Sequence, residues 1–339
     1  MISLQARSFP ETRLRRVRQY EWSRDLVAET SLSVKDLIFP LFIREQESPG
    51  EIASMPGIRR YTIDEVIKVG EEACEYGIPV LALFPHTPNV LKDEDGTEAL
   101  NENNLLNRAL KRLKAEFGHD IGLLADVALD PYTSHGHDGV IRGGHVDNDE
   151  TLRILEKQAV LHAQCGADII APSDMMDGRI RGIRAALDAQ LLSHVKIMSY
   201  AAKYASAFYG PFREAVGAGK IAAMDQPFLK NKLTYQLDSR NSNQALYQTA
   251  LDIAEGADMV IVKPGLPYLD ILCRIKQKFA MPTFAYHVSG EYAMLRLAAD
   301  KGYLDYEKCL IETLYSFKRS GADGIFTYAA FDAAKILMK

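Results

Sequence analysis

The sequence lacks the features that mark several common protein classes. No apolar run in its 339 residues reaches the ~18 residues that a membrane-spanning helix needs. Residues 1–10 contain no apolar core of a secretory signal. No G-x-G-x-x-G follows the first apolar run, so the usual sign of a dinucleotide site is missing. We therefore expect neither a membrane protein nor a secreted one, and no dinucleotide cofactor.

Cysteine is scarce and the net charge is small. The four cysteines are far apart and form no CxxC pair, which is typical of reduced thiols in a cytoplasmic protein. The formal net charge of −5 argues against nucleic acid as the main partner. Four arginines lie between residues 13 and 18, but acidic residues flank them on both sides. This pattern indicates an exposed arm or a subunit contact rather than a nucleic-acid tail.

Short apolar runs alternate with helical patterns along the chain. Most of these runs are apolar on both faces, as expected for parallel strands between a barrel core and covering helices. The eight runs are Leu37–Ile43, 79–84, 121–127, 168–172, 196–201, Met259–Lys263, 283–288 and 324–329. The pattern predicts an α/β fold, a (β/α)8 TIM barrel, with a doubly wound open sheet as the alternative.

Signals at helix ends set the boundaries of this organisation. Thr62 and Glu65 predict a capping box, and a helix over 151–165 is expected to begin at Asn148 or Asp149. Gly-Ala-Asp recurs at 166, 256 and 321, each time before a strand, where glycine can end a helix in the left-handed conformation. We expect an N-terminal arm over 1–33 for subunit contact. A catalytic barrel over 34–339 follows, with lid segments near 128–145 and 204–243.

Chemically useful side chains follow the predicted strands. In a barrel of this type the active site lies at the C-terminal ends of the strands. These ends carry two lysines, carboxylates and hydroxyls, namely Asp126, Ser173, Asp174, Lys203, Lys263, Ser289 and Tyr328. The sequence therefore predicts that these groups converge at one mouth of the barrel.

Lys263 ends a buried strand, where loss of water lowers the pKa of an amine. A neutral amine attacks a ketone to form a Schiff base, and Lys203 would supply a second amine. The alternative is a structural lysine paired with a carboxylate such as Asp126. Two amines could serve two carbonyl substrates, or one could react while the other tunes it, as in class I aldolases. A non-catalytic scaffold has no reason to keep both.

Five segments resemble the porphobilinogen synthase (delta-aminolevulinic acid dehydratase) family. They are DVALDPYTSHGHDG (126–139), APSDMMDGR (171–179), MSYAAKYASAFYGPFR (198–213), ADMVIVKPGLPYLD (257–270) and VSGEYA (288–293). The resemblance implies a lyase of heme biosynthesis that condenses two 5-aminolevulinate molecules into porphobilinogen through lysine Schiff bases. It also implies a homo-octamer whose N-terminal arm wraps a neighbouring subunit.

The resemblance assigns a role to each expected site residue. Lys263 would hold the substrate that supplies the propionate side, and Lys203 the one that supplies the acetate side. Arg213 and Lys232 match the positions that bind the acetate-side carboxylate, and Ser289 and Tyr328 those that bind the propionate-side carboxylate. Gln236 and Tyr200 match other active-site positions, and Asp126 and Ser173 would serve proton transfer.

The sequence departs from the family at two metal positions. Many members bind a catalytic zinc through three cysteines, where this chain has Ala128, Asp130 and Asp138. Alanine cannot ligate and carboxylates favour hard cations, so no catalytic zinc is expected. The nearby His135 and His137 are expected to be lid residues or hydrogen-bond partners. Gln248 stands where related enzymes use a glutamate for an allosteric Mg2+, so magnesium is expected to be weak, absent or bound by other groups.

Overall fold

The computed structural model describes residues 9–218 and 227–339, so parts of the predicted arm and of the 204–243 segment lie outside the described residues. Eight parallel strands form a closed barrel, and β1 completes the circle by pairing with β11. The eight are β1 (Leu37–Ile43), β3 (Val80–Pro85), β4 (Gly122–Val127), β7 (Ile169–Pro172), β8 (Lys196–Lys203), β9 (Met259–Lys263), β10 (Thr283–His287) and β11 (Gly324–Thr327). The predicted barrel is confirmed, and the open-sheet alternative is wrong.

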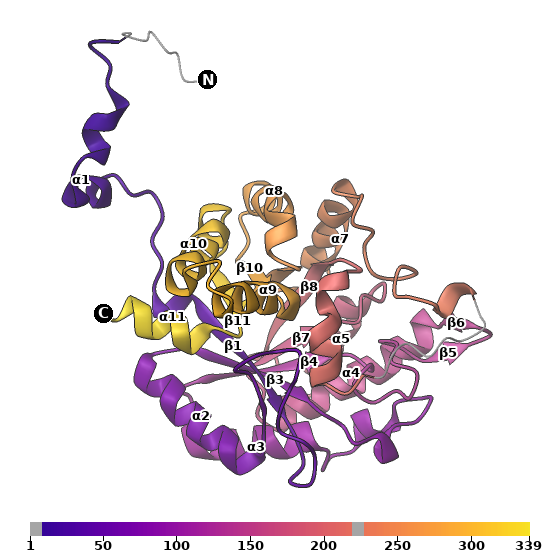
Figure 1. Ribbon diagram of the computed structural model, residues 1–339. Coiled ribbons are helices and arrows are strands. Elements are labelled where there is room, and N and C mark those ends of the chain that lie inside the picture. Colours follow the sequence, from indigo (N-terminus) through magenta and orange to yellow (C-terminus); the bar gives the residue numbers. More distant parts are fainter. Residues whose placement is uncertain (1–8, 219–226) are drawn as a thin grey trace.

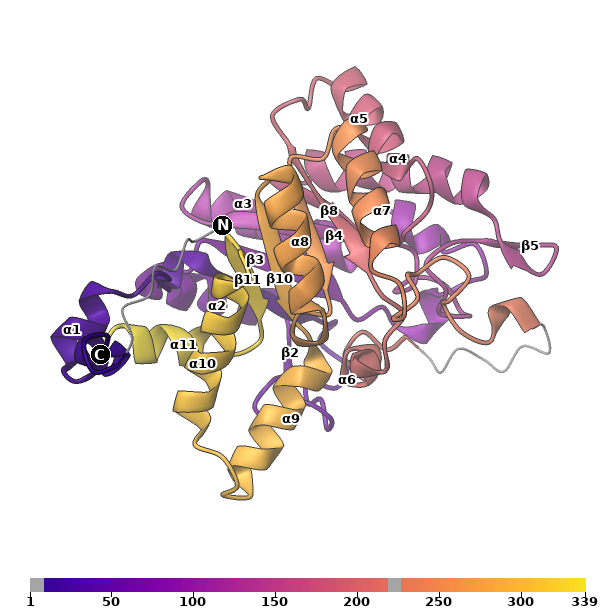
Figure 2. The ribbon, with the colours of Figure 1, turned by 90° about the horizontal axis from the view of Figure 1, so that it is seen from above.

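Helices cover the outside of the barrel (Figures 1 and 2). The longer ones are α2 (Ile63–Tyr76), α3 (Leu105–Phe117), α4 (Asn148–Gln164), α5 (Arg179–Ala189), α7 (Asn243–Ala254), α8 (Leu269–Phe279), α9 (Ser289–Asp300), α10 (Tyr306–Arg319) and α11 (Ala330–Leu337). Shorter elements are α1 (Glu21–Leu26), α6 (Gly210–Ala215), β2 (Arg60–Tyr61), β5 (Ile141–Arg142) and β6 (His145–Val146). Every residue of β1 is buried, as expected for a strand covered on both faces.

The helix caps agree with the sequence in one case and differ in another. Thr62 and Glu65 form the predicted capping box of α2. The predicted cap of α4 is wrong, because Asp147 accepts the Glu150 N–H at 2.8 Å and starts the helix earlier. Asn148 instead accepts the N–H of Asp177 at 2.7 Å, so its side chain serves the loop before α5.

The three Gly-Ala-Asp tripeptides form one repeated junction at the N-terminal ends of the strands. Each glycine ends a helix at positive φ: 111° at Gly166, 112° at Gly256 and 104° at Gly321. Each aspartate then accepts an N–H at the start of the neighbouring strand. These bonds join Asp168 to Leu123 at 3.0 Å, Asp258 to Ile197 at 2.8 Å and Asp323 to Thr283 at 2.7 Å. These bonds therefore hold neighbouring strands together at their N-terminal ends, and the candidate site residues lie at the opposite, C-terminal ends.

The N-terminal segment stands away from the barrel, and its helix α1 lies apart from the helices that cover the strands (Figure 1). Several large apolar side chains there are exposed, including Leu14, Trp22 and Leu26, whose exposed fractions are 69%, 67% and 78%. Within the described residues, no helix is long and apolar enough to cross a membrane.

Candidate active site

Lys203 and Lys263 lie side by side at the C-terminal ends of β8 and β9. They are register partners in the parallel pairing of these strands, so both side chains point to the same face. Both are buried, with exposed fractions of 6% and 5%, and both line one cavity. The predicted convergence of the two amines is thus present in the structure.

Aromatic rings surround the ammonium group of Lys263. Its Nζ lies 5.0 Å from the ring centre of Tyr200, 5.4 Å from Tyr209, 4.8 Å from Phe212 and 4.3 Å from Tyr286. Burial, together with the neighbouring charge of Lys203, lowers the pKa of Lys263 to about 7. A substantial fraction of this amine is therefore neutral, and nucleophilic, near neutral pH.

Lys203 has a more polar environment. Its Nζ donates to the carbonyl of Ser173 and lies 3.7 Å from a carboxylate oxygen of Asp138. Two adjacent amines therefore differ in surroundings, one beside a carboxylate and a carbonyl and the other among rings.

The carboxylates of the site also divide into two kinds. Asp126 accepts the Ser173 hydroxyl at 3.1 Å, its other oxygen has no hydrogen-bond partner among the described residues, and burial raises its pKa to about 7. Burial opposes the ionisation of Asp138 too, but Lys203 and Lys232 hold its pKa at about 2. Asp126 can therefore exchange a proton near neutral pH, while Asp138 stays ionised.

Lys232 lies between Asp130 and Asp138, the two carboxylates at the positions that the family resemblance compares with zinc-binding cysteines. Its Nζ lies 3.3 Å from Asp130 and 2.7 Å from Asp138, and Gln236 donates to Asp138 at 3.0 Å. Ala128 is buried and offers no ligand atom. These residues do not suit a zinc ion, because an ammonium group already lies between the two carboxylates. In the described part of the chain, no group of three or more His, Cys, Asp or Glu is placed to hold a metal.

The two histidines of this loop are hydrogen-bond partners, as expected. His135 Nε2 lies 3.0 Å from the Glu94 carbonyl. His137 bridges the Tyr235 hydroxyl at 3.0 Å and the Leu229 carbonyl at 3.1 Å. His137 therefore joins the loop after β4 to the segment that carries Lys232.

A short helix covers the lysines. Helix α6 carries Phe212 and Arg213, which line the inner cavity, and Arg213 also lines an outer cavity together with Lys232 and Gln236. The inner cavity measures about 30 Å3 and the outer about 470 Å3. The inner space holds little more than water, so lining side chains must move before a substrate can reach Lys263.

Three expected site residues lie behind the cavity lining. The Tyr200 hydroxyl is buried and, in the part of the chain that the structure describes, has no hydrogen-bond partner. The Tyr328 hydroxyl lies 3.4 Å from that of Tyr286, and its ring stacks on Phe42. The Ser289 hydroxyl accepts the N–H of Phe212 at 3.0 Å. Ser289 is thus bonded to α6, and a ligand would have to replace that bond.

Comparison with known proteins decides the family. The family model described as delta-aminolevulinic acid dehydratase matches residues 11–336. The chain belongs to the delta-aminolevulinic acid dehydratase family. It is accordingly a lyase of porphyrin biosynthesis.

Named relatives of this dehydratase family match along almost their whole length. The enzyme of Bradyrhizobium diazoefficiens is 54% identical, over 96% of this chain and 90% of the relative. That of Rhodobacter capsulatus is 48% identical, over 97% of both chains. A solved structure from Toxoplasma gondii, in complex with the reaction product porphobilinogen, is 46% identical. It covers 96% of this chain and 91% of its own, with a TM-score of 0.92.

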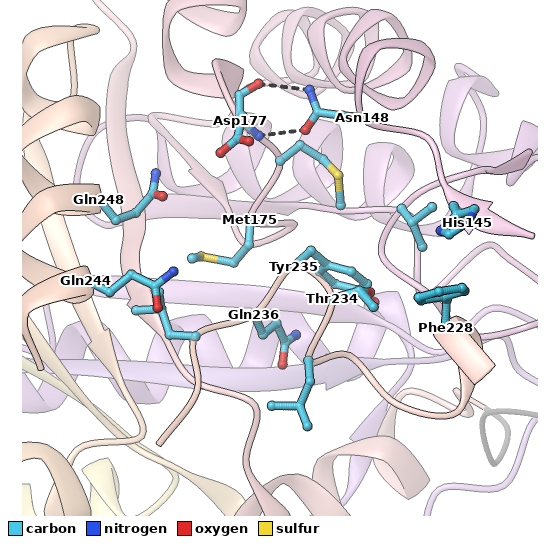
Figure 3. Close-up of a pocket in the computed structure, with 14 residues that line it drawn as sticks. His145, Asn148, Met175, Asp177, Phe228, Thr234, Tyr235, Gln236, Gln244 and Gln248 are labelled. Atoms are coloured by element: carbon cyan, nitrogen blue, oxygen red, sulfur yellow. Dashed lines mark hydrogen bonds between the residues drawn. The ribbon is translucent and has the colours of Figure 1, made fainter. Parts of the chain in front are cut away.

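Gln248, the position at which the family resemblance raised the question of magnesium, lies beside this site. Gln248 lines a cavity of about 390 Å3 that Gln236 also borders, with Gln244 and Gln248 opposite His145 and Phe228 (Figure 3). The Gln248 amide donates to Asp252 at 2.8 Å, and the other oxygen of Asp252 pairs with the buried Arg179 at 3.0 Å. The nearest carboxylate is therefore already neutralised.

Sequence reasoning missed the ring cage around Lys263 and the carboxylate of Glu291. Tyr209 and Phe212 lie in a segment that matched the family, but nothing in their spacing shows that they enclose an amine. Tyr286 alternates with other apolar residues of β10 and is indistinguishable from a core residue by pattern. Glu291 carried one signal, its place in the first turn of α9.

The low pKa of Lys263 predicts a distinctive pH dependence. Borohydride trapping of a keto acid at Lys263 should accelerate with pH up to about 8 and then level, because the neutral amine reacts. N-acetyl-lysine has the ordinary pKa of about 10.4, so its rate should rise about tenfold per pH unit over the same range. Mass spectrometry of the Lys263 peptide and of N-acetyl-lysine at each pH measures the two trapping rates. A Lys263 profile that parallels N-acetyl-lysine would contradict the desolvated amine.

Proposed function

We propose that this protein is a porphobilinogen synthase that condenses two molecules of 5-aminolevulinate into porphobilinogen, with loss of two waters, in heme biosynthesis. The observation that carries this proposal is the pairing of Lys203 with Lys263 at adjacent strand ends. One cavity then holds two amines that can each capture a keto group. Holding both substrate molecules there replaces a rare encounter by an intramolecular step.

The reaction balances with these two amines alone. Each lysine forms an imine with one substrate, and each imine releases the keto oxygen as water. The carbon beside the Lys203 imine loses a proton and attacks the Lys263 imine carbon, and loss of a second proton from the same carbon then expels the Lys263 amine and forms a C=C bond. The amino group of the Lys263-side substrate attacks the other imine carbon and expels the Lys203 amine, and loss of a proton from the carbon that bears this nitrogen completes the aromatic ring. Both lysines return unchanged, and either bond can form first.

Asp126 and Ser173 are suited to the proton transfers. Their 3.1 Å hydrogen bond lies in the cavity that holds both lysines. A carboxyl with a pKa of about 7 can accept a proton from carbon and return it at neutral pH. We assign this exchange to Asp126, with Ser173 orienting it.

The substrate carboxylates have separate partners in this proposal. Arg213 borders both the inner and outer cavities and, among the described residues, forms no ion pair. It would draw in the acetate-side carboxylate together with Lys232, which must then share its charge with Asp130 and Asp138. Ser289 and Tyr328 would bind the propionate-side carboxylate. Gln236 and Tyr200 would complete the lining.

The Schiff-base assignment predicts two labelled lysines. Borohydride reduction with 5-aminolevulinate should attach substrate to both Lys203 and Lys263, as measured by peptide mapping. Lys263→Met should lower pyrrole formation, measured with Ehrlich's reagent, by roughly 1000-fold or more. Lys196→Met, at the exposed start of β8, is the matched control and should retain activity. Labelling of one lysine alone would instead favour an aldolase-like lyase.

We further propose that catalysis is independent of zinc, since Lys232 supplies the positive charge between Asp130 and Asp138. A zinc-selective chelator should leave basal pyrrole formation unchanged. Loss of that activity, with recovery on adding zinc alone, would contradict this. Magnesium activation stays a prediction of the family resemblance, and Gln248 offers it a neutral amide engaged with Asp252.

We also propose that residues 1–33 pack on a neighbouring subunit in a cytoplasmic homo-octamer. The exposed apolar side chains of the arm support this, because Leu14, Trp22 and Leu26 have little cover within one chain. Removing residues 1–28 should shift sedimentation velocity profiles to smaller species. An unchanged sedimentation coefficient distribution, corrected for mass, would contradict an arm-mediated assembly.

A further inference from the structure

Glu291 is a buried carboxylate that the proposed reaction does not use. Its exposed fraction is 2%, and among the described residues it forms no ion pair. One oxygen accepts the N–H of Val288 at 2.6 Å, and the other accepts the N–H of Leu266 at 2.8 Å. Both oxygens are thus bound to main-chain donors from two different segments.

Each of these donors belongs to a segment that carries a site residue. Leu266 lies three residues after Lys263, in the turn that follows β9. Val288 immediately precedes Ser289, at the end of β10. The two strands are neighbours, with Ala285 paired to Val262. A single carboxyl group therefore ties the segment of the reactive amine to the segment of the serine hydroxyl.

The distance between the two segments that Glu291 joins has little freedom to change. A Cβ at Gly265 would lie 2.5 Å from the Phe317 ring and 2.9 Å from the Tyr286 carbonyl, so the turn after Lys263 is packed closely against β10 and α10. On the other side, the Val288 bond fixes the start of α9 as the glutamate half of a capping box, since the valine side chain cannot accept a hydrogen bond.

Only a carboxyl group can make this tie. Burial raises the pKa of Glu291 to about 8, so the position carries an energetic cost. A glutamine would present an NH2 group to one of the two N–H donors and leave that donor unpaired. An apolar side chain would leave both unpaired. The two hydrogen bonds that Glu291 accepts from main-chain N–H groups compensate for the cost of burying its carboxyl group.

We propose that Glu291 is a positioning residue that fixes the separation between the Lys263 amine and the Ser289 hydroxyl, and so makes this half of the site selective for a keto group two carbons from a carboxylate. The inference rests on the proposed function, in which one substrate molecule reacts at Lys263 and binds its carboxylate at Ser289. Glu291 touches neither end of the substrate and acts through the two segments.

The test compares a keto acid with its ester at Lys263. Levulinate contains the keto group and carboxylate of 5-aminolevulinate without the amino group, and methyl levulinate lacks the negative charge. In the wild type, borohydride trapping at Lys263 should favour levulinate. In Glu291→Gln this acid-to-ester ratio should fall by roughly tenfold or more, because a misplacement of about 1 Å can cost as much as 100-fold. The trapping rate of the ester should change little, which a general loss of folded protein would not produce.

A matched control is available in another capping box. Glu65 accepts the N–H of Thr62 at 2.8 Å at the start of α2, away from the lysines. Glu65→Gln should keep the wild-type ratio. Glu291→Asp retains the carboxyl group but is shorter by one methylene, so it should lower the ratio as well, and it decides the question if Glu291→Gln does not fold.

The outcomes separate the two proposals. If the wild type is not labelled at Lys263, the Schiff-base function itself fails. If the wild type is labelled with a preference for the acid, and the folded Glu291 variants keep that preference, the positioning role is overturned while the proposed function stands.

Discussion

The pairing of two buried lysines at the C-terminal ends of neighbouring parallel strands is the constraint on which the rest of the structure depends. Register partners on adjacent parallel strands must point to the same face, so β8 and β9 bring Lys203 and Lys263 together by backbone geometry alone. Two buried ammonium groups on adjacent strands repel each other, and the repulsion is removed when one of the amines is neutral. Burial beside a second amine favours the neutral form of Lys263.

Three amines in this region have three different surroundings. Lys232 lies between two carboxylates, which raise its pKa above the ordinary value against the effect of burial. Lys203 contacts a carbonyl and a more distant carboxylate, and Lys263 contacts rings. Lys232 thus provides a positive charge between Asp130 and Asp138.

Much of this arrangement could be predicted from the sequence, because it follows from the strands. Apolar runs gave all eight barrel strands, and the lysines at two strand ends indicated a shared mouth. The cap at Asp147 was missed because Asn148 and Asp149 are equally good caps by residue type. The ring cage and the double tie of Glu291 depend on contacts across strands and loops, which no local pattern encodes. The narrow inner cavity, similarly, reflects how α6 packs rather than which residues it contains.

The most direct measurement of the central claim is the pKa of Lys263 with and without its neighbour. Competitive acylation of lysines, read by mass spectrometry over a pH series, reports that value in the wild type and in Lys203→Met. The account predicts a pKa of about 7 in the wild type and a higher one in the variant, because the second positive charge is gone. An identical value in both proteins, or an ordinary lysine value in the wild type, would contradict it.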